Sequence, residues 1–363
     1  MRRFRVLGIL IIGALGCESI AGIEDRTFEA PITGSAECEA YCNDVMTACS
    51  GQFAAYSSRA SCVRTCDAFP RGEASQQNTV ECRAQKANIA VTTKEPASDC
   101  PAAGPFGIGA CGSTCDAYCS LLAELCPEEA SAVTNCNASC EALLVSKVYD
   151  LSKLATGDTL ECRIHHLSLA ALDPKECNNA AILPRPGNAC SDPADSAPEC
   201  EDYCRVARVA CSGGLSVYEN EAQCLATCKA LPVGIIGHTT ENSVGCRLYH
   251  SYSAVANPAG HCSHAGPLGD GHCGLDQGAV FGNCESYCAV LEASCKTDFA
   301  GKFASQSDCI KDCASLNGAA KDQGYDVTSA SSGDSVQCRT LHASRAFGDA
   351  GQCAAAMGAA PCN

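Results

Sequence analysis

Large aromatic side chains are scarce in this sequence. It contains no Trp, and Phe, Tyr and Trp together make up only 5% of its 363 residues. Such rings normally supply much of the buried area of a protein core. Much of the apolar content here is Ala and Cys, so the core must be thin and must depend on covalent cross-links for its stability.

Positive charge is also in short supply. Lys and Arg number 25 against 41 Asp and Glu, which gives a formal net charge of −16. Without Arg2, Arg3 and Arg5 at the amino terminus, the charge becomes 22 − 41 = −19. A chain of this charge repels phosphate backbones, and we therefore expect no nucleic-acid partner.

Familiar catalytic motifs are missing as well. The sequence has no Gly-x-Ser-x-Gly, no His-Glu-x-x-His and no Cys-x-x-Cys. The last absence argues against a thioredoxin-type redox centre and against attached c-type haem. We therefore expect neither an enzyme nor a cofactor.

Cysteine, by contrast, is abundant, with 33 residues in the chain. This density is typical of disulfide scaffolds that fold in an oxidising compartment. The amino terminus fits such a location, because a short basic start precedes an apolar run from Val6 to Leu15. The run is too short to cross a bilayer as a helix and has the form of a signal peptide.

The sequence Ala14-Leu15-Gly16-Cys17 resembles the lipobox of bacterial lipoproteins. The resemblance implies that residues 1–16 are removed as a signal peptide and that Cys17 is acylated. Glu18, where Asp would favour the inner membrane, implies delivery to the outer membrane of the cell envelope. We expect residues 17–37 to form a polar, lipidated tether.

The other thirty-two cysteines (33 − 1) fall into four groups of eight. Successive steps in the first group are 4, 7, 13, 4, 16, 18 and 11, and the first 4, the 7 and the second 4 recur in every group. Internal periodicity of this kind predicts tandem repeats. We place repeat 1 at residues 38–111, repeat 2 at 115–190, repeat 3 at 200–273 and repeat 4 at 284–362.

The first cysteines of each repeat have helical spacing. Cys38, Cys42 and Cys49 share one helix face, and a second Cys-x3-Cys pair begins another apolar stripe. Two antiparallel helices can then be joined twice. The predicted pairs are Cys38–Cys66, Cys42–Cys62, Cys115–Cys140, Cys119–Cys136, Cys200–Cys228, Cys204–Cys224, Cys284–Cys313 and Cys288–Cys309. This hairpin is similar to the twin Cys-x3-Cys hairpins of small mitochondrial chaperone-like proteins. The other four cysteines of each repeat admit three connectivities.

A third helix is expected after motifs such as Asn78-Thr79-Val80, in which Asn or Asp would be the N-cap. The predicted fold is therefore all-α and disulfide-rich, with three helices per repeat. The Gly- and Pro-containing segment that ends each repeat is expected to be an irregular loop.

Three other positions recur: an acid after the first cysteine, a Tyr before the second and an Arg after the sixth. We expect salt bridges, covered by the Tyr, in the pairs Glu39–Arg83, Asp116–Arg163, Glu201–Arg247 and Glu285–Arg339. The alternative is a repeated ligand-contact patch, since Tyr and Arg are favoured in binding hot spots. Burial of the Arg would favour the structural interpretation.

Histidine is unevenly distributed. His166, His250 and His342 stand four residues after the sixth cysteine of their repeats, and we expect them to be isolated surface or capping residues. Repeat 3 also contains His261, His264 and His272, which are candidates for a zinc or copper site. Because they lack the fixed spacing of a zinc finger, we expect no metal.

These observations predict a lipid-anchored envelope protein that acts as a disulfide-stapled structural or interaction module. Its partner would be another envelope protein or a polysaccharide. The alternative is a metal- or thiol-buffering protein of the envelope, and a third possibility is a secreted hydrolase or inhibitor.

Overall fold

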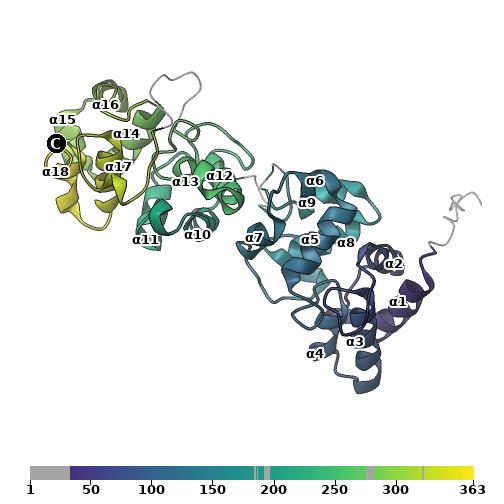
Figure 1. Cartoon of the computed structure of the whole chain (residues 1–363). Coiled ribbons are helices and arrows are strands. Elements are labelled where there is room, and N and C mark those ends of the chain that lie inside the picture. Colours follow the sequence, from purple (N-terminus) through teal and green to yellow (C-terminus); the bar gives the residue numbers. More distant parts are fainter. Residues whose placement is uncertain (1–32, 184, 186, 192–196, 275–281, 321–322) are drawn as a thin grey trace, which may run out of the picture. The chain divides into compact units, whose positions relative to one another are not determined.

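The computed structural model describes residues 33–183, 185, 187–191, 197–274, 282–320 and 323–363 (Figure 1). The predicted signal peptide, Cys17 and most of the tether lie outside these residues. The regular elements of the described part are α-helices and short 3-10 turns, and the one β contact there is an isolated bridge between Asn317 and Ser335. This confirms the predicted all-α, disulfide-rich fold class. None of the described helices combines the length and apolar character needed to cross a bilayer.

The helices follow the cysteine repeats in order. Repeat 1 contains α1 (Ala36–Ala48), α2 (Arg59–Ala68), α3 (Val80–Thr93) and α4 (Pro96–Ala103). Repeat 2 contains α5 (Thr114–Leu125), α6 (Pro127–Ser131), α7 (Cys136–Glu141), α8 (Leu160–Ala170) and α9 (Cys177–Ala180). Repeat 3 contains α10 (Cys200–Ala210), α11 (Glu221–Cys228), α12 (Val244–Ala256) and α13 (Pro258–Ala265). Repeat 4 contains α14 (Gly282–Ser294), α15 (Lys296–Lys302), α16 (Gln306–Cys313), α17 (Val336–Arg345) and α18 (Cys353–Ala356).

Each of the sixteen disulfides joins two cysteines of the same repeat. The hairpin helices are joined by Cys38–Cys66 and Cys42–Cys62 in repeat 1, and by the equivalent pairs in the other repeats, as the helical spacing predicted. The third cysteine pairs with the seventh, and the sixth with the eighth. These pairs are Cys49–Cys100, Cys82–Cys111, Cys126–Cys177, Cys162–Cys190, Cys211–Cys262, Cys246–Cys273, Cys295–Cys353 and Cys338–Cys362.

The described residues of the repeats contain more than the three predicted helices: four in repeats 1 and 3 and five in repeats 2 and 4. The end of each repeat differs from the predicted irregular loop, because a short last helix carries the seventh cysteine. These helices are α4, α9, α13 and α18. α4 and α13 begin with Pro, whose fixed φ suits the first helical position. A tight turn does follow, and Gly107 adopts a φ of 67° there. A Cβ on Gly107 would lie 2.9 Å from the carbonyl oxygen of Cys111, so this turn requires glycine.

The helix that was predicted as the third of each repeat also starts one residue later than predicted. These helices are α3, α8, α12 and α17. The N-cap of each is a Thr or Ser whose hydroxyl accepts a hydrogen bond from the backbone amide of the sixth cysteine. The caps are Thr79, Thr159, Ser243 and Ser335. The preceding Asn or Asp is therefore free for a different role.

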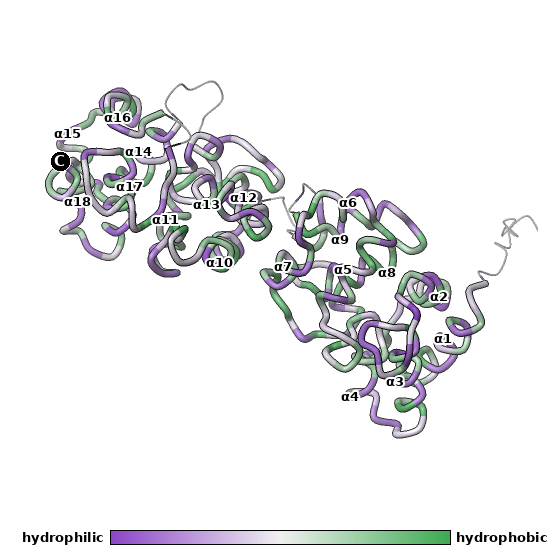
Figure 2. Tube along the Cα trace, viewed as in Figure 1, coloured by the Kyte–Doolittle hydropathy of each residue, from purple (hydrophilic) through white to green (hydrophobic). Residues whose placement is uncertain are grey.

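The core of each repeat is built from disulfides, buried Tyr and small apolar side chains. Cys38, Cys62 and Tyr118 have no exposed surface. Hydrophobic and hydrophilic stretches alternate along the helices (Figure 2), as expected of helices that bury one face. The predicted dependence of a thin core on covalent cross-links is thus visible in its composition.

Candidate functional site

The recurring Arg is buried in all four repeats. The exposed fraction is zero for Arg83, Arg163 and Arg247 and 8% for Arg339. Arg83 donates from Nε to the carbonyl of Gly104 at 3.3 Å and from Nη1 to the carbonyl of Thr79 at 3.2 Å. Its Nη2 donates to Oδ1 of Asn78 at 3.0 Å. A guanidinium that is buried and fully engaged in this way holds the fold together and is closed to ligands.

The predicted salt bridges Glu39–Arg83, Asp116–Arg163 and Glu201–Arg247 are wrong, and in repeat 4 Arg339 pairs with Asp334. The structure pairs Glu39 with Arg59 and uses Asp116 in a capping box with Ser113. The recurring Arg instead binds the residue five positions before it, at 2.7–3.1 Å. These pairs are Asn78–Arg83, Asp158–Arg163, Asn242–Arg247 and Asp334–Arg339. The sequence showed this position as a recurrent Asn or Asp, but its nearness to the helix start suggested a cap.

The recurring Tyr contributes a second fixed bond. Its hydroxyl donates to a backbone carbonyl at the end of the last helix of the repeat, at 2.6–2.7 Å. The pairs are Tyr41–Ala103, Tyr118–Ala180, Tyr203–Ala265 and Tyr287–Ala356. In repeats 1, 2 and 3 the Arg Nε binds the very next carbonyl. Burial raises the pKa of Tyr287 to about 12, so the phenol stays a neutral donor.

The Asn or Asp also connects successive repeats. Asn78 donates from Nδ2 to Oγ of Ser120 in α5 at 2.7 Å. Asp158 lies 2.8 Å from Nη2 of Arg205 in α10. The hydroxyl of Ser286 in α14 donates to Oδ1 of Asn242 at 3.0 Å. One side chain therefore holds the Arg of its own repeat and the first helix of the next.

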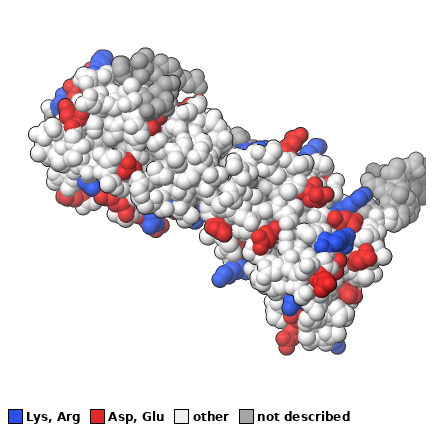
Figure 3. All heavy atoms as spheres, viewed as in Figure 1, with Lys and Arg blue, Asp and Glu red and all other residues white. Residues whose placement is uncertain are grey.

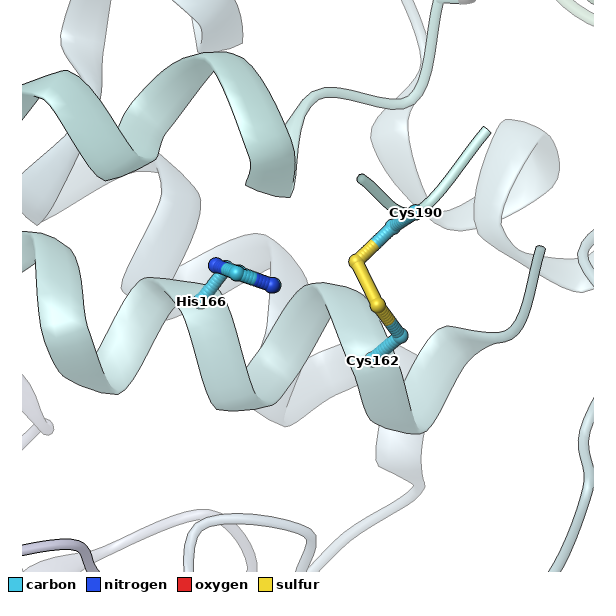
Figure 4. Close-up of side chains that lie close together, drawn as sticks. All are labelled: Cys162, His166 and Cys190. Carbon is cyan, nitrogen blue, oxygen red and sulfur yellow. A yellow bond between two sulfur atoms is a disulfide. The ribbon is translucent and has the colours of Figure 1, made fainter. Parts of the chain in front are cut away.

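The histidines that follow the sixth cysteine, predicted to be surface or capping residues, are buried, so the surface interpretation is wrong. His166, His250 and His342 are only 5–6% exposed. His166 lies beside the Cys162–Cys190 disulfide (Figure 4). The two sulfur atoms are bonded to each other and offer no thiolate to a metal. Nδ1 of His166 lies 2.6 Å from Oε2 of Glu176, which makes a local His–carboxylate pair.

Repeat 3 brings four imidazoles together. Nδ1 of His250 lies 3.0 Å from Nδ1 of His261, and the ring centroids of His264 and His272 are 4.0 Å apart. One ligand atom from each of His250, His264 and His272 can be chosen so that all lie within 4.8 Å of one another. The sequence grouped His261, His264 and His272 as the candidate ligands and placed His250 only upstream of them, whereas helix α12 brings the His250 side chain into the cluster.

The electrostatics at His250 and His261 favour uncharged rings. Burial above all, and then the neighbouring His264, His261 and His272, lower the pKa of His250 to about 4, against the raising effect of the Thr239 carbonyl. Burial and His272 lower the pKa of His261. A neutral imidazole keeps one nitrogen lone pair, which is what a metal ion requires of it.

Comparisons with known proteins touch parts of this chain. The model of a family described as "BfoA family C-terminal domain" matches residues 198–277, which include all of repeat 3. "Aurasperone B biosynthesis cluster protein A" of Aspergillus niger is 35% identical over 68 residues, 18% of this chain and 22% of that protein. "Putative EGF-like domain-containing protein R659" of Acanthamoeba polyphaga mimivirus is 29% identical over 121 residues, 30% of this chain. The chain thus spans 22% of the length of each relative, and no solved structure matches.

Proposed function

We propose that this chain is a lipid-anchored envelope protein that displays rigid helical repeats to a protein partner. The lipobox-like sequence ending at Cys17 supports the anchor, and its removal from the count leaves an even number of cysteines for disulfides. The closed Tyr–Arg arrangement supports a scaffold role for the interior of each repeat. Recognition then falls to the outer surface.

The observation that carries the proposal is a pair of exposed apolar loops at equivalent places in repeats 2 and 3. Each loop connects the hairpin to the third helix. The exposed fractions are 46% for Leu144, 45% for Val145, 51% for Val233 and 46% for Ile235. Exposed aliphatic groups gathered in one loop are typical of surfaces that bind other proteins.

These loops are held firmly in place. The backbone amide of Leu160 donates to the carbonyl of Leu144 at 2.8 Å, and that of Gly245 donates to the carbonyl of Val233 at 3.0 Å. The carboxylate of Glu161 accepts from two further loop amides, those of Ser146 and Lys147. A loop ordered before binding loses little conformational entropy in a complex.

The chemistry favours a protein partner over a polysaccharide. The loops offer aliphatic side chains, whereas Tyr41, Tyr118 and Tyr203 are buried and donate to backbone carbonyls. On the face shown in Figure 3, Asp and Glu are dispersed and not gathered into one patch. We therefore infer that the exposed aliphatic side chains of both loops bind the partner together, and that the two linked contacts give a stronger attachment than either loop alone.

Photo-crosslinking in the native envelope tests this proposal. A photoreactive residue at Val145 or Val233 should give the same cross-linked product, because both loops contact one partner. Adding Val233→Asp to the Val145 probe should lower the yield by more than about tenfold, since two linked contacts reinforce each other. Val209, 57% exposed on α10 and outside both loops, is the matched control position. Equal cross-linking at Val209 would reject the proposal.

The thiol-buffering alternative is not supported by this arrangement. All thirty-two cysteines in the described part of the chain are paired in disulfides, so that part offers no thiol to a metal or an oxidant. The interior does not favour the hydrolase or inhibitor alternative either. The recurring Tyr and Arg side chains there donate hydrogen bonds to backbone carbonyls within the repeat.

A further inference from the structure

The four histidines of repeat 3 occupy positions that can be compared directly between repeats, because the cysteine framework aligns them. Counting from the sixth, seventh and eighth cysteines, repeat 3 has His250, His261, His264 and His272. The same positions hold Lys86, Asp99, Ala102 and Ala110 in repeat 1, His166, Glu176, Asn179 and Ala189 in repeat 2, and His342, Gln352, Ala355 and Pro361 in repeat 4. Histidine fills all four positions in repeat 3 alone.

The replaced residues explain what changed. In repeat 2 the buried His166 binds Glu176, and in repeat 4 Nδ1 of His342 lies 2.6 Å from Oε1 of Gln352. Each of these rings therefore places its Nδ1 against an oxygen atom of a side chain, and His166 also binds the carbonyl of Ala155 through Nε2. In repeat 3 the ring of His250 faces nitrogen atoms instead, from His261 at 3.0 Å and from the neighbouring pair of rings.

One tautomer of His250 is fixed by the backbone. Its Nε2 lies 3.0 Å from the carbonyl oxygen of Thr239, which can only accept, so Nε2 carries the proton. Nδ1 therefore presents its lone pair to the other histidines. A backbone carbonyl that orients the far nitrogen is the usual support of a metal-binding imidazole.

The spacing suits a single ion. Adjacent nitrogen ligands of a tetrahedral zinc ion, with bonds of about 2.0–2.1 Å, lie roughly 3.3 Å apart. The two Nδ1 atoms of His250 and His261 are 3.0 Å apart, and one ligand atom each of His250, His264 and His272 lie within 4.8 Å of one another. An ion shared by all four rings requires His264 and His272 to move closer to His250. Because all donors are imidazole nitrogens, the cluster favours zinc-like ions over calcium or magnesium.

Two disulfides fix these side chains in place. His261 and His264 flank Cys262, which is bonded to Cys211. His272 precedes Cys273, which is bonded to Cys246 one helical turn before His250. The donors thus sit on a covalently closed frame that exists without a metal, unlike a zinc finger, which folds only when the metal binds.

We propose that repeat 3 binds one divalent transition-metal ion of the zinc type through His250, His261, His264 and His272. The site is separate from the exposed loops of the proposed function and stands or falls independently of them. Its half-buried position beside a disulfide frame allows an ion to enter from solvent while the scaffold stays rigid.

Calorimetric titration of Zn²⁺ into the full, oxidised, EDTA-treated chain tests the site. We expect one ion per chain, and a more than about tenfold weaker affinity in His264→Gln and in His272→Gln, since each removes one donor. The matched control is the double variant His238→Gln/His342→Gln, which removes histidines outside the cluster and should bind as the unmodified chain does.

Folding is checked in each variant by the absence of free thiols and an unchanged helical circular dichroism spectrum. His272 is exposed, so its replacement leaves the core intact. Failure of Zn²⁺ to saturate at one ion per chain would overturn the proposal. So would wild-type affinity in a folded His264→Gln/His272→Gln chain.

Discussion

At the scale of single residues, the position five before the recurring Arg joins that Arg to the next repeat in repeats 1, 2 and 3. Repeats 1 and 3 use Asn there, and burial lowers the pKa of both Arg83 and Arg247. Repeat 2 uses Asp158. Burial is the largest influence on Arg163 and acts to lower its pKa, but Asp158, Tyr252 and Tyr118 together outweigh burial and the pKa rises. The buried Arg is therefore held by a neutral Asn in repeats 1 and 3 and by a charged Asp in repeat 2.

Asp158 should be the most sensitive of these positions, because it is 10% exposed and also binds Arg205. Replacing it with Asn leaves the buried Arg163 without a carboxylate and leaves Arg205 with Asp202 alone, and we expect a loss of about 3 kcal/mol in the free energy of unfolding. The matched control is Asp334→Asn, where the carboxylate is 54% exposed and should cost at most about 1 kcal/mol. Unfolding in guanidinium chloride without reductant measures the free energy of unfolding of both variants. Equal losses in the two variants would contradict the roles assigned to Asp158 and Asp334.

The limits of sequence-based prediction are also clearest at this scale. Charge alone suggested that Glu39 would pair with Arg83, because opposite signs are visible in a sequence. The partners that Arg83 actually uses include two backbone carbonyls, and no sequence pattern marks a carbonyl that lies at the end of a helix. Asn78 was visible, but its position before a helix suggested capping, and Thr79 fills that role.

At the scale of helices and turns, local spacing decided what could be predicted. The steps of 4 and 7 place Cys38, Cys42 and Cys49 on one face, so helix α1 and both of its hairpin disulfides followed from the sequence. Helix α9 has only four residues, too few to show any helical period. Its place depends on the long-range Cys126–Cys177 disulfide, which spacing along the chain does not specify.

Helix α8 should make the protein sensitive to mild acid. Burial above all, and then the charge of His166, lower the pKa of His165 from 6.5 to about 4, against the opposing effect of Glu176. The unfolded chain therefore binds more protons than the folded chain between these values. The contribution of His165 to the free energy of unfolding is complete above pH 6.5 and is lost as the pH falls toward 4. The loss is at most about 3 kcal/mol.

Unfolding free energies from pH 7 to 4.5, measured in metal-free buffer, test this expectation. His165→Gln should flatten the decline with falling pH, while His238→Gln, which alters a half-buried histidine on another loop, should leave the slope unchanged. The residual slope in His165→Gln reflects His250, whose pKa is also lowered to about 4. An unaltered slope in His165→Gln would show that its titration does not limit stability.

At the scale of the whole molecule, the chain repeats one covalent plan four times and varies its surface. The third-to-seventh and sixth-to-eighth pairs recur in every repeat, and the Asn or Asp beside the Arg contacts the first helix of the next repeat. The repeats differ in their additional helices, α6 in repeat 2 and α15 in repeat 4, in the apolar loops of repeats 2 and 3 and in the histidines of repeat 3. A common frame with local specialisation is what a modular binding protein requires.

All four repeats share one disulfide connectivity. Peptide mapping by mass spectrometry without reduction is the direct test of this shared connectivity. The protein is first treated with a thiol-alkylating reagent and then digested. We expect no alkylated cysteine among residues 38–362 and only linked peptides of the four pair types, such as Cys38–Cys66, Cys42–Cys62, Cys49–Cys100 and Cys82–Cys111. Peptides that link two different repeats, or cysteines alkylated without reduction, would contradict the account.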